Sequence, residues 1–483
     1  ILKKKILRKV VKKMDDKSSF EEIKERLTCK RENVWCQNND HDITKFSEDY
    51  KIALNNGKTE REFANFSKNY LLNRGFKEFN EPSQKGTLTE KLFRLIKGKV
   101  LIAFSPGIEP IDNGINIVAA HIDSPRLDLK QNPLYEDSGF AYLDTHYYGG
   151  IKIYQWLSIP LAIHGEIVKS DGSKINVVIG EDDKDPVFVI TDLLPHLSRD
   201  FREKKIGEIF KGEDLDILVG GLPLEFNCSE KEAVKLNVLK ILNEKYGITE
   251  EDLSSAEIEI VPKGNALDLG FDRSMIISYG QDDRVCAYTA LRAIAELNNP
   301  SKLSSMVVLL DKEEIGSEGN TGAKSRIIED FIEDLIVSYG VQTTTTKVFM
   351  KSNCLSGDVS AAFDPRYKDA YETRNSAYFN KGVTINKFTG VGGKSGSSDA
   401  SAEFVGKIRK LFNDNCIKWQ TAELGKVDVG GGGTVAKFFA ERGMEVLDCG
   451  PALLSMHAPY EVSSKADVYE TYRAYLAFLK NFS

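Results

Sequence analysis

The chain has 483 residues, of which 41% are hydrophobic and 28% are charged, and its formal net charge at pH 7 is -7. This length allows two or three domains with substantial cores, and no uninterrupted apolar stretch is long enough to cross a membrane. The negative charge argues against nucleic-acid binding, and seven scattered cysteines without a Cys-x-x-Cys pair indicate a reducing, cytoplasmic environment.

The first elements along the chain are predicted to be helical. Residues 1–14 are interpreted as a basic arm, because seven Lys and Arg fall within the first thirteen residues. A membrane-surface amphipath and a segment outside the natural start of the protein are the alternatives. From Asp15 to Gly98 the pattern is mostly helical, as in "KTEREFANFSKNYLLNRGF", where apolar residues recur at helical spacing before Gly75.

β-rich segments dominate the next part of the chain. The apolar run "INIVAA" ends at His121, and "FAYLDTHYYGG", "KINVVIG" and "PVFVITDLL" follow, with one helical stretch near "KEAVKLNVLKILNEKYG". After "SMIISYGQDD" helices and strands alternate up to a final helix, "KADVYETYRAYLAFLKNF". Such alternation predicts an α/β fold with a mostly parallel sheet flanked by helices. We therefore expect one discontinuous α/β domain, residues 15–126 and 264–483, interrupted by an inserted β-rich second domain at 127–263.

Acidic residues and histidines follow several of the predicted strands. Glu313 and Glu314 come shortly after the apolar run "SSMVVLL", and other strands are followed by His121, Asp123, Asp282, Asp283, Asp358 and His457. Each alone has an ordinary explanation, such as a helix cap, a turn or a charged loop. Together they lie where sites form in open α/β sheets, outside the carboxyl ends of strands. Two histidines and several carboxylates offer the ligands of zinc and other divalent ions, so the sequence predicts a metal site.

Five motifs in chain order carry a resemblance to a known family: "AAHIDSPRL", "QDDRVCAY", "DKEEIGSEG", "SGDVSAAFDP" and "LLSMHAPYE". They resemble the aspartyl aminopeptidase and vacuolar aminopeptidase I family of dinuclear metallopeptidases. The similarity covers nearly the whole chain after about Asn33, including "YYGG", "PLAIHG" and "LLPHL" in the insertion, and it leaves out residues 1–13. It implies a zinc-exopeptidase-like fold, whose insertion serves dimerisation and assembly of a homo-oligomer, a tetrahedral dodecamer.

The resemblance also implies a set of metal ligands. His121 and Asp358 would bind one divalent ion. Glu314 and His457 would bind the other, and Asp282 would bridge the two. Zinc is the expected metal, with manganese or cobalt as alternatives.

Two further carboxylates would take part in catalysis. Asp123 would orient the imidazole of His121 and fix its tautomer. Glu313, which stays unligated, would be the general base. The implied reaction is hydrolysis of the first peptide bond of a peptide with a free N-terminus.

The resemblance leaves the preferred N-terminal residue open. Aspartyl members prefer Asp or Glu, which need a cationic partner, whereas the vacuolar type favours apolar residues. Three lysines are candidates for the cation, with exposed loop lysines as the alternative interpretation: Lys381, Lys387 and Lys394. Eukaryotic aspartyl members carry a second histidine four positions after the first in the "PHL" motif. Here His196 matches the first, but Asp200 takes the place of the second, which leaves the contact with a neighbouring subunit open.

Two other classes of function compete with a peptidase. "GVGGKSGSS" resembles a phosphate-binding loop, although Phe388 replaces the required first glycine, and the turn can instead enter a helix capped by Ser397, Ser398 or Asp399. "DVGGGGTVAKFF" offers an anion site at a helix N-terminus, a tight turn or a wall of the substrate pocket. A non-catalytic, metal-stabilised assembly protein is the third possibility. The presence of Glu313, which metal binding does not need, favours the peptidase.

Overall fold

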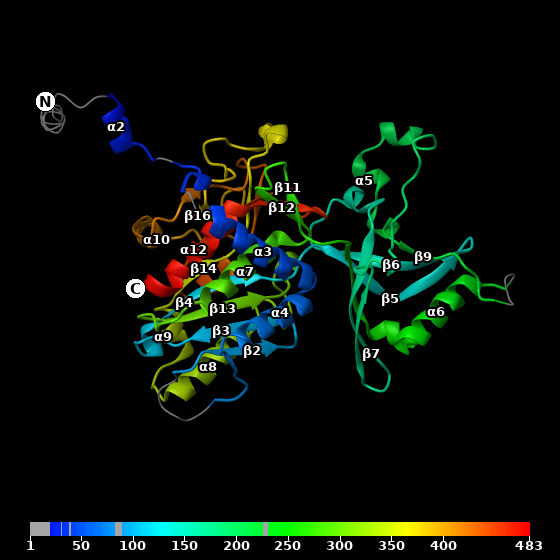
Figure 1. The fold of residues 1–483 in the computed structure, drawn as a ribbon, viewed down its shortest axis with the longest axis horizontal. Coiled ribbons are helices and arrows are strands. Elements are labelled where there is room, and N and C mark those ends of the chain that lie inside the picture. Colours follow the sequence, from blue (N-terminus) through cyan, green and yellow to red (C-terminus); the bar gives the residue numbers. More distant parts are fainter. Residues whose placement is uncertain (1–19, 30, 38–39, 83–88, 226–229) are drawn as a thin grey trace, which may run out of the picture.

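The structure of the protein is a computed structural model that describes residues 20–483 apart from 30, 38–39, 83–88 and 226–229. The basic arm predicted at 1–14 lies outside the described residues. Figure 1 shows a larger lobe, to which the C-terminal helix belongs, and a smaller lobe that projects from its side.

A nine-stranded sheet runs through the larger lobe in the order β1-β2-β3-β13-β4-β14-β20-β16-β18. Five neighbouring pairs are parallel, including the central run β13-β4-β14-β20, and three are antiparallel. Its strands are Lys77–Glu78 (β1), Leu92–Ile96 (β2), Val100–Ser105 (β3), Ile115–His121 (β4), Ser304–Leu310 (β13), Asn353–Ser356 (β14), Val383–Asn386 (β16), Trp419–Thr421 (β18) and Glu445–Gly450 (β20). Strands β4 and β13 are buried along their whole length, as continuous apolar strands covered on both faces should be.

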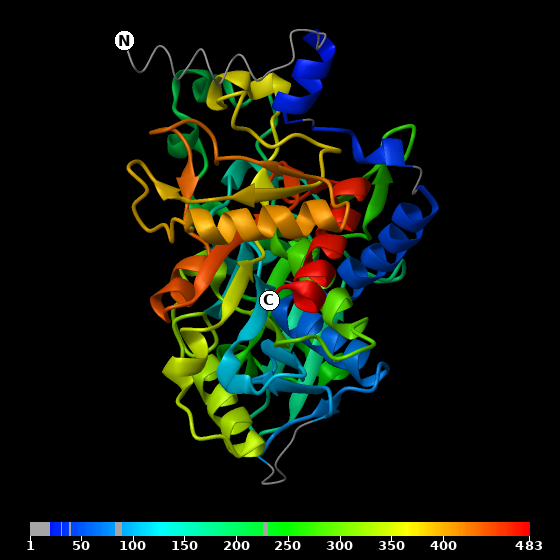
Figure 2. The same cartoon turned by 90° about the vertical axis from the view of Figure 1, so that its left-hand side faces the viewer.

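Helices cover both faces of this sheet. One face carries α3 (Asp40–Asn56), α4 (Glu60–Leu72), α7 (Gln281–Ala295), α10 (Ala402–Asp414) and α12 (Lys465–Asn481), and the other carries α8 (Ile327–Tyr339), α9 (Thr345–Phe349) and α11 (Ala436–Glu441). Figure 2 shows α10 and α12 lying against one another on the first face. Because side chains alternate along a strand, Val118 and Ala120 of β4 enter the first core, and Ile117 and Ala119 enter the second.

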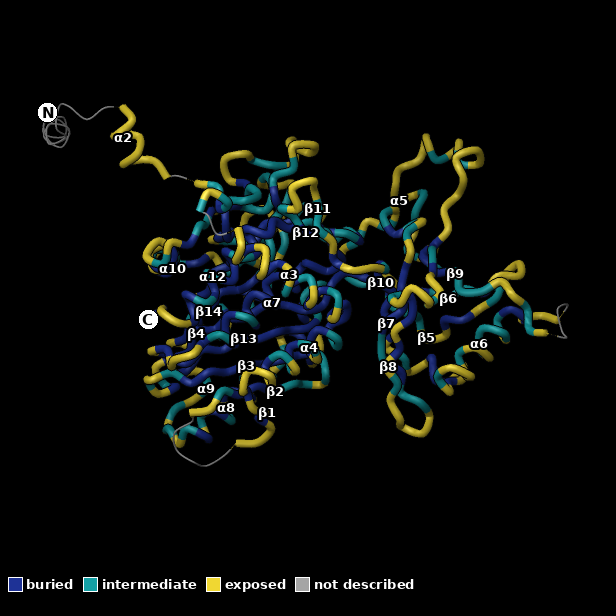
Figure 3. Tube along the Cα trace, in the orientation of Figure 1, coloured by how far each residue is buried: buried dark blue, intermediate teal, exposed yellow. Residues whose placement is uncertain are grey.

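The smaller lobe is built on a six-stranded antiparallel sheet in the order β8-β7-β10-β5-β6-β9. Its strands are Arg126–Asp137 (β5), Phe140–Tyr148 (β6), Leu161–Val168 (β7), Lys174–Ile179 (β8), Ile217–Gly220 (β9) and Glu257–Pro262 (β10), with the helices α5 (Ile206–Ile209) and α6 (Ala233–Tyr246). The lobe has a hydrophobic core of its own, and Figure 3 shows buried stretches along its strands. Trp156 belongs to this core and is fully buried. The chain enters through β5 and leaves through the adjacent β10.

A third sheet closes the larger lobe next to the carboxyl ends of the central strands. Its order is β11-β12-β22-β21-β15, from Leu267–Leu269 (β11), Met275–Ser278 (β12), Ser360–Ala361 (β15), Ala452–Leu454 (β21) and Glu461–Ser464 (β22).

The remaining elements are short. Gly390–Val391 (β17) pairs with Gly431–Gly432 (β19), and Phe20–Leu27 forms α2. Short 3-10 helices lie at Val34–Gln37, Ile111–Asn113, Ile153–Trp156, Arg199–Glu203, Gly212–Asp214, Glu251–Ser255, Glu313–Ile315 and Pro365–Ala370. None of the described helices is both long and apolar enough to cross a bilayer.

Two expectations about strands and helices are wrong. The mostly helical stretch predicted up to Gly98 ends at Leu72, and "LFRLI" instead forms β2, which pairs with both β1 and β3. In "PVFVITDLL", the residues Phe188, Val189 and Ile190 make only isolated bridges, because each pairs with a different segment. A run of apolar residues thus defines a strand only where a neighbour continues the hydrogen-bond ladder.

The predicted cap of α10 is also wrong. Ser401 is the N-cap, and its hydroxyl accepts the Phe404 N–H at 3.1 Å. Ser397 instead accepts N–H groups of Thr389 and Asp399 within its own loop. The glycine-rich loop "GVGGKSGSS" therefore ends before the helix begins and does not present its N-terminus to an anion.

Candidate metal centre

The predicted site residues meet at the carboxyl ends of three central strands. His121 is the last residue of β4, Glu313 and Glu314 follow β13, and Asp358 follows β14. Because β13, β4 and β14 are parallel neighbours, their carboxyl ends lie side by side. The sheet therefore brings together side chains that are far apart in the sequence.

At three positions in or next to the candidate ligands, the backbone departs from regular strand or helix geometry. Lys312 has φ +65°, and the 3-10 turn that follows it places both adjacent glutamates on one cavity. Asp282 has non-helical angles at the start of α7, and His457, between β21 and β22, has φ +63°. Sequence patterns cannot predict these turns, because each depends on the φ and ψ angles of a single residue.

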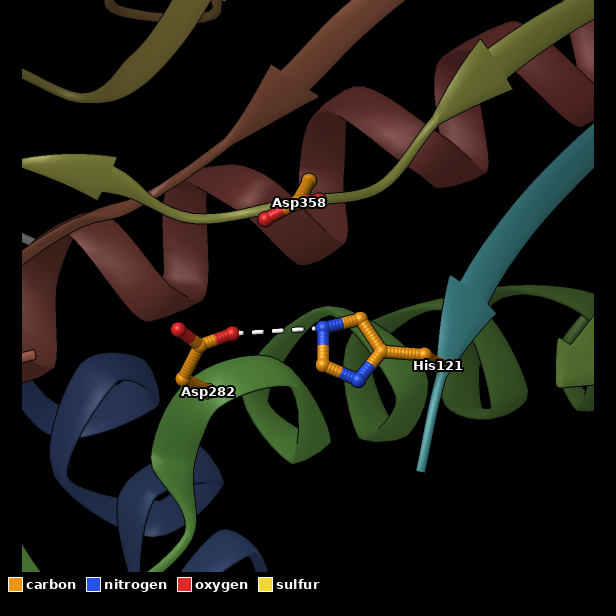
Figure 4. A group of neighbouring side chains, drawn as sticks. All are labelled: His121, Asp282 and Asp358. Atoms are coloured by element: carbon orange, nitrogen blue, oxygen red, sulfur yellow. Dashed lines mark ion pairs between the residues drawn. The ribbon is translucent and has the colours of Figure 1, made fainter. Parts of the chain in front are cut away.

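Asp282 lies between two imidazoles. Its Oδ1 is 3.3 Å from Nε2 of His121, and its Oδ2 is 3.3 Å from Nε2 of His457. Figure 4 shows Asp282 facing the ring of His121, with Asp358 on the neighbouring segment. Three groups of possible ligands, each with its atoms within 4.8 Å of one another, overlap here: His121, Asp282 and Asp358; His121, Glu313 and Glu314; and Asp282, Glu314 and His457.

The cluster contains more buried carboxylates than its histidines can neutralise. Burial, reinforced by repulsion from other acids, raises the pKa of Asp358 and of Glu314 well above their usual range. Burial opposes the ionisation of Asp282 as well, but hydrogen bonds with His121 and His457 lower the pKa of this carboxyl. Oε1 of Glu314 is buried and has no hydrogen-bond partner. Divalent cations would satisfy this oxygen and remove the repulsion, so the donor set fits zinc or a similar ion.

Asp123 connects the first histidine to the two glutamates. Its carboxylate is fully buried, and Oδ1 lies 3.3 Å from Nδ1 of His121. The backbone N–H groups of Glu313 and Glu314 donate to Oδ1 and Oδ2, each at 3.2 Å. Burial acts in the opposite direction, but the hydrogen bond with His121 lowers the pKa of Asp123, which stays ionised. This carboxylate is thus placed to orient a ring and a turn together.

Glu461, which no sequence pattern indicated as a site residue, holds the other side of the cluster. It is buried, and its carboxylate accepts the backbone N–H groups of Gln281 at 2.6 Å, Asp282 at 3.0 Å and His457 at 2.8 Å. Glu461 belongs to the motif "LLSMHAPYE", but a side chain that accepts hydrogen bonds from backbone N–H groups has no recognisable sequence pattern. One carboxylate therefore fixes the backbone of two candidate ligands.

The cluster opens into a cavity of about 190 Å³. Its other lining residues are Val359, Ser360, Asn386, Thr389, Leu424, Gly431, Gly432, Gly433, Thr434, Asp448 and Met456. Asp448 is buried and accepts a hydrogen bond from Thr434 at 2.7 Å. The glycines of "DVGGGGTVAKFF" thus form a wall of this cavity, and no Lys or Arg stands among its described lining residues.

The three candidate lysines lie outside this lining. Lys381 donates to the carbonyl of Arg31, and Lys387 is exposed. Lys394 pairs with Asp399 at 3.2 Å. In the smaller lobe, His196 and Asp200 are both exposed.

The fold and the cluster define a metal-dependent hydrolase of the mixed α/β class. The sequence model of the aminopeptidase I zinc metalloprotease (M18) family matches residues 53–479, and the chain belongs to this family. It is therefore a metal-dependent aminopeptidase.

Close relatives extend over almost the whole chain. A probable M18 family aminopeptidase 1 of Clostridium acetobutylicum is 51% identical over 457 residues, which cover 93% of this chain and 98% of the relative. The crystal structure of an M18 aminopeptidase from Thermotoga maritima has 48% identity and a TM-score of 0.90, covering 94% of this chain and 100% of the other. Yeast aminopeptidase 1, at 20% identity, a TM-score of 0.74 and coverage of 91% and 98%, shares the fold.

Replacing Glu461 tests how the backbone of the site is held. In Glu461→Ala three backbone N–H groups lose their acceptor, and the two that are buried each cost about 1–3 kcal/mol. We expect the melting temperature of the chelator-treated protein to fall by about 5 °C or more, measured by calorimetry. Glu441→Ala, which removes an exposed glutamate, is the control. Equal melting of the two variants would refute the anchoring role.

Proposed function

We propose that the protein is a dinuclear metallo-aminopeptidase in which Asp282 bridges two divalent ions. His121 and Asp358 would complete one site, and Glu314 and His457 the other. The position of Asp282, with one carboxylate oxygen 3.3 Å from each imidazole, carries this assignment. Nitrogen and oxygen donors of this kind suit zinc, with manganese or cobalt as alternatives.

Glu313 is the proposed general base. Its side chain is 17% exposed, compared with 4% for Glu314, and its Oε2 is 3.9 Å from Nε2 of His121. It therefore borders the open part of the cavity, where a water molecule can reach it. Burial raises the pKa of Glu313 to about 7 in the cluster without bound ions, and divalent cations would lower it and favour the ionised carboxylate that a base requires.

Bound divalent ions would polarise the scissile carbonyl and increase the acidity of the attacking water. Glu313 accepts the proton of this water and delivers it to the leaving amine. The acidic lining suits the positive α-amino group of a peptide. A cavity of about 190 Å³ has room for little more than one side chain, which supports removal of a single N-terminal residue.

The cavity of the single chain favours neutral over acidic N-terminal residues. Leu424, Val359 and Met456 supply apolar surface, and Asp448 adds a buried carboxylate. An Asp or Glu side chain of the substrate would enter without a cation among the described lining residues, at a high cost in desolvation. This arrangement supports the apolar alternative, and an acidic preference would require a cation from another subunit.

Comparing Glu313→Gln with Glu314→Gln separates base from ligand. Glu313→Gln keeps size and shape but removes the proton acceptor, so kcat should fall by about two to four orders of magnitude. Its metal content, measured by mass spectrometry of the purified protein, should be unchanged. Glu314→Gln removes a charged ligand and should lose metal together with activity.

Two outcomes would contradict these roles. Near-normal turnover of Glu313→Gln at full metal occupancy would exclude Glu313 as the base. Equal metal retention in both variants would exclude Glu314 as a ligand.

Aminoacyl p-nitroanilides with Leu, Met, Ala, Asp and Glu test the preference. We expect kcat/KM for the neutral substrates to exceed that for Asp and Glu at least tenfold, because a charge that enters unpaired costs more than about 1.4 kcal/mol. The assay is repeated with zinc, manganese and cobalt. A higher kcat/KM for the acidic substrates would refute the neutral preference and point to a cation outside the single chain.

We further propose that residues 127–263 form a separate domain that joins copies of the chain, while 15–126 and 264–483 form the metallopeptidase domain. The smaller lobe has its own core and exposes a hollow of about 600 Å³ lined largely by apolar side chains. Val187 and Ile241 border this hollow and are 47% and 53% exposed. An apolar surface of this kind suits an interface. Yeast aminopeptidase 1, which shares the fold, has been solved as a dodecamer.

Light scattering tests the assembly. The mass in solution should be several times the 54.0 kDa of one chain. The double variant Val187→Asp/Ile241→Asp should lower the mass, because it places charges in the interface. Ile52→Asp, at an exposed position of α3, is the control and should leave the mass unchanged. A stable, active monomer of the unaltered protein would refute the proposal.

A further inference from the structure

The end of strand β6, in the smaller lobe, reaches the metal cluster of the larger lobe. The hydroxyl of Tyr148 donates to Oδ2 of Asp123 at 2.9 Å. Two residues later, the carbonyl of Gly150 lies 2.9 Å from Nδ1 of His457 and accepts its hydrogen. These three consecutive residues, Tyr148–Gly150, therefore contact both sides of the cluster.

Gly149 shows how closely this segment packs. A Cβ atom at this position would lie 3.3 Å from Cβ and 3.5 Å from Oε2 of Glu314. Its φ is +74°, which favours glycine. A side chain here would press on a proposed ligand, so the glycine permits the strand end to approach the site.

Tyr148 can influence the geometry of the metal cluster through its hydrogen bond to Asp123. The same carboxylate lies 3.3 Å from Nδ1 of His121, which is also 3.0 Å from the backbone carbonyl of Asp123, and it accepts the backbone N–H groups of Glu313 and Glu314. Without the Tyr148 hydroxyl, one donor to Oδ2 is lost and the carboxylate is freer to rotate. Rotation would loosen the glutamate turn and weaken the contact of the carboxylate with the imidazole.

The ring of Tyr148 is itself held in place. The guanidinium of Arg126 lies over it, 4.0 Å from the ring centroid. Arg126 is fixed by Asp128 at 2.7 Å and by Glu60, from helix α4, at 3.3 Å. Burial and the charge of Asp123 raise the pKa of Tyr148 far above its ordinary value, so its hydroxyl stays protonated and donates. The contact therefore has a fixed direction and a fixed donor.

We propose that Tyr148 is a positioning residue for the metal centre, acting through Asp123 on His121 and on the Glu313–Glu314 turn. The smaller lobe then completes the catalytic site, in addition to its proposed role in assembly. This inference rests on the proposed function, because it assigns a purpose to the geometry of the proposed ligands. It concerns orientation only, since Tyr148 is not placed among the cavity-lining residues.

The test compares Tyr148→Phe with Tyr147→Phe. Tyr148→Phe keeps the ring under Arg126 and removes only the hydroxyl, whereas Tyr147 is the adjacent, exposed tyrosine of the same strand. Partners of metal-binding histidines are typically worth 10–100-fold in metal affinity or activity, and Tyr148 acts one contact further out. We therefore expect about tenfold weaker zinc binding by calorimetry and about tenfold lower kcat, with KM nearly unchanged. The absorption spectrum of the cobalt-substituted protein should shift in Tyr148→Phe alone.

A double-mutant cycle with Asp123→Asn tests whether Tyr148 acts through Asp123. If it does, adding Tyr148→Phe to Asp123→Asn should weaken zinc binding by less than twofold further. Losses that multiply would show an independent effect and would overturn the proposal. Should Tyr148→Phe fail to fold, Arg126→Lys carries the test, because it keeps the positive charge but removes the guanidinium that lies over the Tyr148 ring, and it should also weaken zinc binding.

Zinc affinity and a cobalt spectrum of Tyr148→Phe equal to those of the unaltered protein would overturn the positioning role. Failure of the proposed function has a different signature. An unaltered protein that binds zinc but hydrolyses no aminoacyl substrate would refute the peptidase assignment, while the zinc and cobalt measurements would still decide the role of Tyr148.

Discussion

Repulsion among the buried carboxylates of Asp282, Glu314 and Asp358 is the constraint on which the rest of the structure depends. Two imidazoles cannot neutralise these groups, and one oxygen of Glu314 has no partner. A fold that keeps such a cluster must stabilise it from outside, since unpaired buried charge is costly. Bound cations and hydrogen bonds from fixed groups can both stabilise the cluster. The residues around the cluster supply the hydrogen bonds.

Two carboxylates outside the proposed ligand set provide this support. Asp123 accepts from the glutamate turn and contacts His121, while Glu461 accepts from the backbone of Asp282 and His457. Each connects segments that lie far apart in the chain. The centre is therefore held by the packing of β4, β13, α7 and β22, and by the strand end that the smaller lobe contributes. This dependence explains why the site needs the whole fold and cannot be reduced to a short motif.

The sequence pattern predicted the mixed α/β fold. It also identified as candidates the residues that meet in the cluster, because apolar runs followed by His, Asp or Glu mark strand ends. It could not predict the cap Ser401 or the roles of Glu461 and Tyr148, since these depend on which backbone or carboxylate lies nearby in space. The same limit applies to the lysines predicted to bind an acidic substrate side chain, because their contacts also depend on the folded chain. Lys381 and Lys394 have partners elsewhere on the surface, and only the folded chain shows that they do not line the cavity.

X-ray diffraction from crystals grown with zinc, with anomalous data collected at the zinc edge, would show whether the cluster binds two ions bridged by Asp282. We expect two peaks, one about 2.0–2.2 Å from ligand atoms of His121 and Asp358 and the other at the same distance from those of Glu314 and His457. Asp282 should contact both ions. A single peak, or a zinc ion bound by Glu313, would contradict this assignment.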